Sequence, residues 1–514
     1  MKHTPLRDRL LGIGMGCCFF AAAVTALNVL ILPFARECYR IGWLPELAAC
    51  AGALALFSLL GRALRRMEDA RAERLAHAAS PAFLIFLLAA QLILGYLMAY
   101  TPSGDNFMLI RGSQMLARDG SFAANPDFGL YLARFSNQWG FFLMLTGLFR
   151  LLALFGLEDC LFVLVAIQAL LYTAAMRAVQ RLARRLRGAR GEIMMTALLF
   201  LCLPLYLAAA VLYTDTFSLP FVVFTLCCAQ RVLDAPDGRR QLLWAALCAL
   251  SALVGGQIKM TVAIALIAAA ILWLLRLPPL RAALLSAMCA AVLLVGTAGV
   301  HRAMLSGVID PDVYAQENTP LIHWVMMSIP TGDNPYGGAT GDYGITWGMM
   351  DEGATHEEVM DSILTRMKDR IYTLRYPNRL LAALLRKNAA GMGDGTYGMT
   401  EMLDDGPLRE NAVSAVVLEG RPYYPLYAAA CTGIAMAHML LAAAGTLRAL
   451  RARDTRTALP AVAMVGIILF LLIWEARGRY GFGFMPALLL LSCDSLCRGG
   501  GRIFPPSARK EAQP

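Results

Sequence analysis

Two aspartates stand just beyond apolar runs of the sequence. Asp105 lies in Ser103-Gly104-Asp105-Asn106, and Asp215 lies in Tyr213-Thr214-Asp215-Thr216. Either one could cap the helix that follows, which is a common use of Asp. Two carboxylates that face one cleft would instead suit acid–base chemistry or metal binding. Asp105 and Asp215 are therefore the candidate catalytic residues, and Asp105 is the first candidate ligand if a metal is bound.

Two further segments carry basic side chains. Gly255-Gly256-Gln257-Ile258-Lys259 separates two short apolar runs, and its glycines would let the chain turn. A Lys at membrane depth is costly, so it faces protein or a watery cavity unless it snorkels to the interface. In Trp474-Glu475-Ala476-Arg477-Gly478-Arg479-Tyr480, Glu475 either pairs with an arginine or leaves a guanidinium for phosphate. Lys259, Arg477 and Arg479 are the candidate phosphate-binding residues.

The elements that must position these side chains are membrane-spanning helices. The chain of 514 residues is 58% hydrophobic and 16% charged. Its apolar residues gather in runs of roughly 18–24, the length that a helix needs to cross a bilayer. We predict an all-α polytopic membrane protein with about twelve spans at Leu11–Phe34, Leu44–Leu60, Pro81–Tyr100, Leu161–Met176, Ile193–Leu212, Phe217–Val232, Leu242–Gly255, Thr261–Leu275, Ala282–Val300, Tyr424–Leu447, Ala458–Trp474 and Phe482–Leu496.

The basic residues predict how the chain is threaded. With the N-terminus inside, every second connection is rich in arginine, as the positive-inside rule requires. These connections are 62–74, 177–190, 237–240, 276–281 and 448–456. The net charge of +10 is thereby explained without nucleic acid. We expect a multi-pass protein of the cell membrane, with a retained signal anchor, both termini cytoplasmic and the candidate site extracytoplasmic.

This threading requires the apolar run 137–155 to lie flat on the outer surface. Gln138, Thr146 and Arg150 recur at multiples of four and would form one polar stripe. Four regions result. They are 1–80, a cytoplasmic tail and two-helix hairpin; 81–300, a core with an outer loop at 101–138 and the flat helix at 137–155; 301–422, an extracytoplasmic insert; and 423–514, the last spans and a cytoplasmic tail.

The insert has one clear helix start and several aromatic residues. Thr355 and Glu358 form a capping box before an amphipathic run to Tyr372, and the Gly/Asp-rich stretches 331–347 and 391–398 are expected to be loops. His323 and Trp324 are candidate sugar or acceptor contacts, although a His in this setting usually serves packing. The thirteen cysteines show no spacing typical of a zinc site or a disulfide framework.

This arrangement resembles the GT-C class of membrane glycosyltransferases, which includes protein O-mannosyltransferases and the lipid A aminoarabinose transferase. Asp105-Asn106 with the helix after it resembles the acidic motif of the first outer loop, and 137–155 resembles the flat juxtamembrane helix. Asp215 and Lys259 resemble further family positions. WEARGRYGFGFMP is similar to the family's ending, matching Glu475, Arg479, Tyr480 and Pro486. Asn106 and Ser136-Asn137-Gln138 depart from the family's acidic positions.

The resemblance implies a hexosyl- or pentosyltransferase of the cell envelope, mannosyltransferase-like, that inverts the anomeric centre. The donor would be a polyprenyl-phosphate sugar, and the acceptor an extracytoplasmic glycan, protein or lipid. A divalent metal ion is left open. Asn106, Gln138, Glu475 and Tyr480 join His323 and Trp324 as candidate contacts to sugar or acceptor. A transporter or flippase, a lipid-linked glycan polymerase or ligase, and a non-catalytic scaffold are the alternatives.

Overall fold

The computed structural model describes residues 5–39, 42–157, 159–338, 341–403 and 407–498, and these ranges contain helices and no strand. Nine of the described helices are long and apolar enough to cross a membrane. They are α1 (Pro5–Ile31), α3 (Trp43–Arg66), α4 (Asp69–Leu97), α8 (Leu161–Phe200), α10 (Thr214–Asp234), α11 (Gly238–Ile258), α13 (Pro279–Gly307), α20 (Tyr424–Arg451) and Gly478–Cys497, which joins α22 (Gly478–Gly481), η3 (Phe482–Phe484) and α23 (Met485–Cys497). Two shorter apolar helices, α12 (Val262–Arg276) and α21 (Ala458–Ile473), accompany them. The prediction of an all-α polytopic membrane protein is confirmed.

Helix α8 is a hairpin of two helices. Its backbone leaves the helical region at Arg187 and at Gly188, which has a φ of +64° that a glycine adopts without strain. The two arms run side by side, because Gln180 donates to Thr196 at 3.0 Å and Gln168 donates to the Ala208 carbonyl at 2.9 Å. Both pairs are equidistant from residue 188. The arms therefore correspond to the predicted fourth and fifth spans, and short α9 (Leu203–Leu207) extends the second arm.

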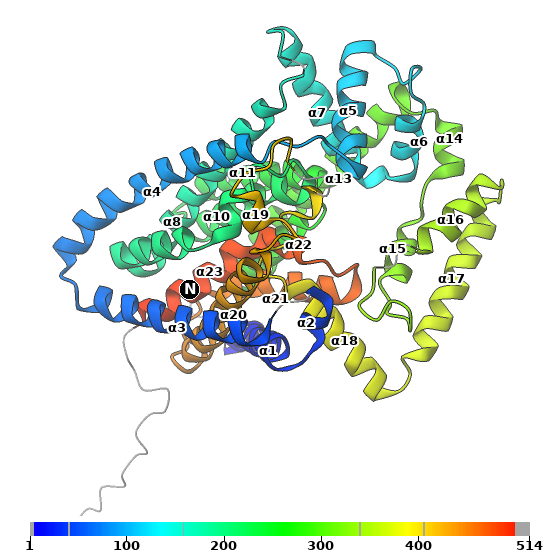
Figure 1. Ribbon diagram of the computed structural model, residues 1–514. Coiled ribbons are helices and arrows are strands. Elements are labelled where there is room, and N and C mark those ends of the chain that lie inside the picture. Colours follow the sequence, from blue (N-terminus) through cyan, green and yellow to red (C-terminus); the bar gives the residue numbers. More distant parts are fainter. Residues whose placement is uncertain (1–4, 40–41, 158, 339–340, 404–406, 499–514) are drawn as a thin grey trace, which may run out of the picture.

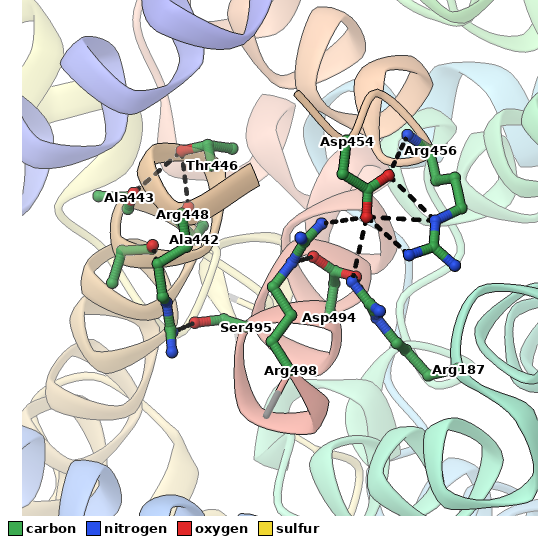
Figure 2. Close-up of polar contacts among 11 residues, drawn as sticks. Arg187, Ala442, Ala443, Thr446, Arg448, Asp454, Arg456, Asp494, Ser495 and Arg498 are labelled. Carbon is green, nitrogen blue, oxygen red and sulfur yellow. Dashed lines mark hydrogen bonds and ion pairs between the residues drawn. The ribbon is translucent and has the colours of Figure 1, made fainter. Parts of the chain in front are cut away.

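The predicted arginine-rich connections meet at one end of the bundle, here called the arginine-rich end. Arg184 pairs with Glu73, and Arg276 donates to Thr455 at 2.8 Å. Arg187, at the turn of α8, binds Asp494 of α23 at 2.6 Å. Figure 2 shows this last contact within a network in which Arg187, Arg456 and Arg498 surround two aspartates, Asp454 and Asp494. These connections share one end, as the threading predicts; its cytoplasmic location stays a prediction.

At the other end of the bundle lie four short helices. They are α5 (Gly104–Asp119), α6 (Asp127–Arg134), η1 (Ser136–Gln138) and α7 (Trp139–Ala153). Helix α7 has 15 residues, fewer than the roughly 20 needed for a span. The predicted polar stripe on it is wrong. Gln138 and Thr146 are buried, with Thr146 donating to the Phe142 carbonyl at 3.0 Å, and Arg150 alone is exposed. That the helix lies flat stays a prediction.

The insert contributes α14 (Pro311–Glu317), α15 (Leu321–Met327), α16 (Gly341–Asp351), α17 (His356–Thr373), α18 (Pro377–Met392), η2 (Glu401–Leu403) and α19 (Ser414–Val417), and α2 (Phe34–Tyr39) follows α1. Figure 1 shows α14 to α17 at the right of the view, beside the bundle. The capping box at Thr355 is confirmed. The expected loop 331–347 is partly wrong, because α16 begins at Gly341; residues 339–340 lie outside the described residues.

Helix α18 returns from the insert to the bundle. Asn28 of α1 donates to Asn388 at 2.9 Å, and the Tyr39 hydroxyl donates to the Ala390 carbonyl. The second expected loop, 391–398, therefore starts inside packed structure, since α18 extends to Met392. Two of the predicted regional boundaries, at 80 and at 300, fall within the continuous helices α4 and α13.

Candidate functional site

A polar cavity of about 260 Å³ lies at the end of the bundle opposite the arginine-rich end. Segments far apart in the sequence line it. They are the start of α5, residues 135–138, the start of α10, the turn after α11, α15, α16, and the end of α21 with the segment that follows it. Eight of the predicted site residues line this cavity. They are Asp105, Gln138, Lys259, Trp324, Glu475, Arg477, Arg479 and Tyr480.

Asp105 lies in the first turn of α5 and is half-buried. The helix is entered from Ser103, its N-cap, through Gly104, whose φ is +51°, so Asp105 is not itself the cap. Its carboxylate accepts hydrogen bonds from Tyr213 at 2.7 Å and Tyr131 at 3.1 Å. Burial, and then the nearby Asp105 charge, raise the pKa of Tyr131 well above its usual value. The phenol therefore stays protonated and donates to a carboxylate that faces the cavity.

Asp215 lies beneath the cavity and does not line it. Only 3% of its side chain is exposed, and it forms ion pairs with Lys259 and with Arg479, the latter at 3.4 Å. Arg479 also binds Glu401 at 2.9 Å, and the Lys259 ammonium lies 4.0 Å from the centre of the Tyr480 ring. Since both oxygens of Asp215 face cations, its position fits a counter-ion that holds Lys259 and Arg479 toward the cavity.

The turn that carries Lys259 differs from its prediction. The two glycines belong to α11, and the chain turns after them, at Lys259–Thr261. Gly255 serves close packing instead, because a Cβ there would lie 2.5 Å from the Phe221 Cβ of α10. Lys259 thus stands at the tip of the α11–α12 hairpin, fixed by the packing of the hairpin against α10.

Glu475 anchors the second basic segment. It accepts hydrogen bonds from Tyr480 at 2.6 Å and from Arg477 at 3.3 Å. Burial raises the pKa of Glu475, but the Tyr480 hydrogen bond and the two arginine charges outweigh burial and lower it. Glu475 is therefore a carboxylate, and the predicted pairing of Glu475 with an arginine is present. Arg477 is the more exposed arginine, with 41% of its side chain accessible.

Lys387 of α18 fixes the same segment from behind. The ammonium donates to the carbonyls of Ser328 at 2.7 Å and Trp474 at 2.8 Å, so it ties α15 to the end of α21. Burial lowers the pKa of Lys387 to about 7. Lys387 is a positioning residue for the residues that follow Trp474.

Aromatic side chains from the insert form another wall of the cavity. Trp324 and Tyr343 line it, with ring centres 5.6 Å apart. His323 is fully buried behind them and shares a hydrogen bond of 3.0 Å with Thr346. Burial, and then the Arg366 charge, lower the pKa of His323 to about 4. His323 therefore packs behind the wall as a neutral ring. This agrees with the packing role that the sequence analysis gave as the alternative to a contact with sugar or acceptor.

Asn106 is the other predicted residue that does not reach the cavity. It is buried and donates to the Tyr100 hydroxyl at 3.0 Å. A metal site also lacks its donors here. The described residues contain no group of three His, Cys, Asp or Glu that could hold an ion, Asp105 contacts two phenols, and Asp215 is occupied by two cations. The described residues of this cavity therefore do not fit a bound metal.

Several residues of the site were missed by the sequence reasoning. Tyr213 is the first residue of the segment that contains Asp215, so that segment carried a signal, although Tyr213 itself was given no role. Tyr131, Glu401 and Lys387 carried none, because each reaches the site through a contact distant in sequence.

The helices and their hydropathy define an all-α, multi-pass integral membrane protein, here with a polar cavity at one end of the bundle. The family model of the conserved hypothetical integral membrane proteins matches residues 145–496, well over half of the chain, and the chain belongs to this family. The matched region includes Asp215, Lys259 and Arg479 but not Asp105. No curated protein matches the chain significantly.

Proposed function

We propose that this protein is a membrane glycosyltransferase that moves a hexose or pentose from a polyprenyl-phosphate donor to an extracytoplasmic acceptor. One observation carries the proposal. A single cavity joins a half-exposed carboxylate, Asp105, to three cations, Lys259, Arg477 and Arg479. The resemblance of several short motifs to the GT-C class favours the same reaction.

Lys259 and Arg479 face the cavity while their acidic partners lie behind them, whereas Arg477 pairs with Glu475 at the cavity wall. Asp215 lies beneath the cavity and Glu401 on the far side of Arg479, and neither lines it. Lys has three donors and Arg has five, so each cation that pairs with an acid keeps donors for a second anion. Cations fixed in this way stabilise a charge that develops in the transition state without reorganising. A leaving phosphate is such a charge.

The reaction is a single displacement. Asp105 accepts the proton of the acceptor hydroxyl, whose oxygen attacks the anomeric carbon of the donor. The bond from that carbon to the phosphate oxygen breaks, and its electron pair leaves with the polyprenyl phosphate. Lys259 and Arg479 stabilise the phosphate through charge-assisted hydrogen bonds. Tyr131 and Tyr213 orient Asp105, and the faces of Trp324 and Tyr343 offer apolar contact to the sugar.

The lipid chain would leave the cavity along its apolar rim. Ile258, Met260 and Phe470 line that side, and they come from the ends of α11 and α21 and the turn between α11 and α12. A donor held there keeps its phosphate beside Lys259 and its chain against hydrocarbon. This arrangement needs the site end to face away from the cytoplasm, as the arginine distribution predicts.

The test uses purified full-length protein with polyprenyl-phosphate mannose, glucose or arabinose as donors and measures release of polyprenyl phosphate. Asp105→Asn should lower turnover by about 10²–10⁴-fold, the usual contribution of a general base. Asp127→Asn is the matched control, because Asp127 is an exposed acid on α6 outside the cavity. Equal turnover in the two variants would show that Asp105 is not the base. Solute uptake without release of polyprenyl phosphate would favour the transporter alternative instead.

A further inference from the structure

A second cavity, of about 520 Å³, opens between α8, α10 and α11 near the arginine-rich end. Most of its lining is apolar and includes Phe221, Phe224, Leu247, Leu250 and Val254. Leu250 is 53% exposed and Leu247 is 39% exposed, so in a bilayer this groove opens toward lipid. The volume lies within the roughly 300–1,000 Å³ typical of small-molecule sites.

The end of the groove is basic. Arg177, Arg181 and Arg185 recur every four residues on the first arm of α8, which places them on one helix face. Arg231 of α10 joins them, and its guanidinium lies 5.2 Å from the centre of the Trp244 ring. A Trp at this position is typical of the boundary between hydrocarbon and headgroups. The groove therefore has an apolar body and a cationic head.

The acids near the groove do not neutralise this head. Arg177 pairs with Glu192, which also serves Arg184, and Arg185 pairs with Asp234. Arg181 is exposed and makes no polar side-chain contact within the described part of the chain, which leaves its guanidinium directed to solvent or to a headgroup. Four arginines thus face two acids, and the surplus positive charge sits at the mouth of an apolar groove.

We propose that this groove binds an anionic phospholipid, with its phosphate at Arg181 and Arg231 and one acyl chain along α10 and α11. The apolar groove fits the acyl chain, and the surplus positive charge of the arginines attracts the anionic headgroup. Basic pockets between membrane helices are typical sites for anionic headgroups. This site lies at the end of the bundle opposite the sugar-transfer cavity and does not depend on that activity.

The experiment is native mass spectrometry of the full-length protein in detergent, titrated with dioleoylphosphatidylglycerol or dioleoylphosphatidylcholine. Arg181→Gln should weaken phosphatidylglycerol binding by about fivefold, as loss of one cation at a membrane surface does. Arg239→Gln is the matched control, because Arg239 is an exposed arginine at the same end that does not line the groove. Ala178→Trp fills the groove without removing charge and should abolish binding of the specific lipid.

Four results would overturn the proposal. The first is equal affinity for the two lipids. The second is an Arg181→Gln protein that binds phosphatidylglycerol as tightly as Arg239→Gln. The third is a protein dimer that Ala178→Trp disrupts, which would mark the groove as a contact between two copies. The fourth is displacement of the bound lipid by glycerol 3-phosphate, which would show a site for free phosphate.

Discussion

Asp215 allows a direct test of whether the acid under the cavity is a counter-ion or a reacting group. Asp215→Asn keeps the size and shape of the side chain and removes its charge. Lys259 and Arg479 would then lie beside each other with Glu401 as the remaining acid on Arg479. Breaking a buried ion pair from one side costs about 3–5 kcal/mol. Because 15% of each cation's side chain is exposed, we expect the lower end of this range.

The double variant Asp215→Asn/Lys259→Met restores the charge balance. Arg479 keeps Glu401, and the unpaired ammonium is gone. Residues in direct contact couple by about 0.5–3 kcal/mol, so the double variant should be more stable than Asp215→Asn alone. The assay is thermal unfolding of detergent-purified protein, followed with a thiol-reactive dye, because buried free cysteines such as Cys248 and Cys493 become accessible on unfolding.

Asp361→Asn is the control, since Asp361 is exposed on α17 and its loss should change stability little. The counter-ion assignment is refuted if Asp215→Asn unfolds at the same temperature as the control and the added Lys259→Met substitution does not raise that temperature. If that stable variant has also lost turnover of the lipid-linked sugar, Asp215 is the catalytic residue that the sequence predicts.

Three further predictions concern stability. The pKa of Lys387 is about 7 in the folded protein and about 10.4 in the unfolded chain, so between these values the unfolded chain binds more protons. The stability of the wild type should therefore rise from pH 7 to pH 9 by at most about 1.4 kcal/mol per pH unit. Lys387→Met should remove this rise. The pKa of His323 is lowered to about 4, so wild type should lose stability from pH 6.5 toward pH 4, with the same limiting slope, and His323→Gln should lose less. Arg187→Gln removes a charged hydrogen bond to buried Asp494 and should cost about 1.5–3 kcal/mol. Melting midpoints across the stated pH ranges check the first two, and denaturant unfolding at neutral pH checks the third.

Each of these variants has a matched control. Lys368→Met removes an exposed lysine of α17, and it should keep the wild-type pH profile. His356→Gln serves in the same way for His323, since His356 is exposed. Arg456→Gln probes the network of Figure 2 at a side chain that is 56% exposed, and it should cost less than Arg187→Gln. A lysine or histidine variant that shares its control's pH profile, or equal costs for the two arginines, contradicts the corresponding assignment.

The parts of the fold that follow from local physics could be predicted from the sequence. Apolar length predicts helices, since lipid offers no partner for an unpaired backbone, and arginine bias predicts which connections share an end. The capping box at Thr355 is local in the same sense. Helix α16 was missed because its glycines resemble a loop, whereas tertiary contacts hold it: Asp342 in its first turn pairs with Arg366 and Arg370 of α17.

The site could be predicted as a set of residues but not as a geometry. Asp105 was identified by its place beyond an apolar run, yet its partners Tyr131 and Tyr213 lie 26 and 108 residues away. No periodicity encodes such contacts. For the same reason the sequence could not separate Asp105, which faces the cavity, from Asp215, which lies beneath it.

The cations at the two ends of the bundle are held in different ways, and this difference supports giving them different roles. At the cavity, Asp215 and Glu401 from other segments fix Arg479 and Lys259 before any ligand arrives. Such preorganised charge suits a transition state, where reorganisation is part of the barrier. In the groove, Arg181 stands on an exposed helix face, free to follow a headgroup that exchanges with the bilayer. Mutation should therefore affect turnover at the first end and lipid occupancy at the second.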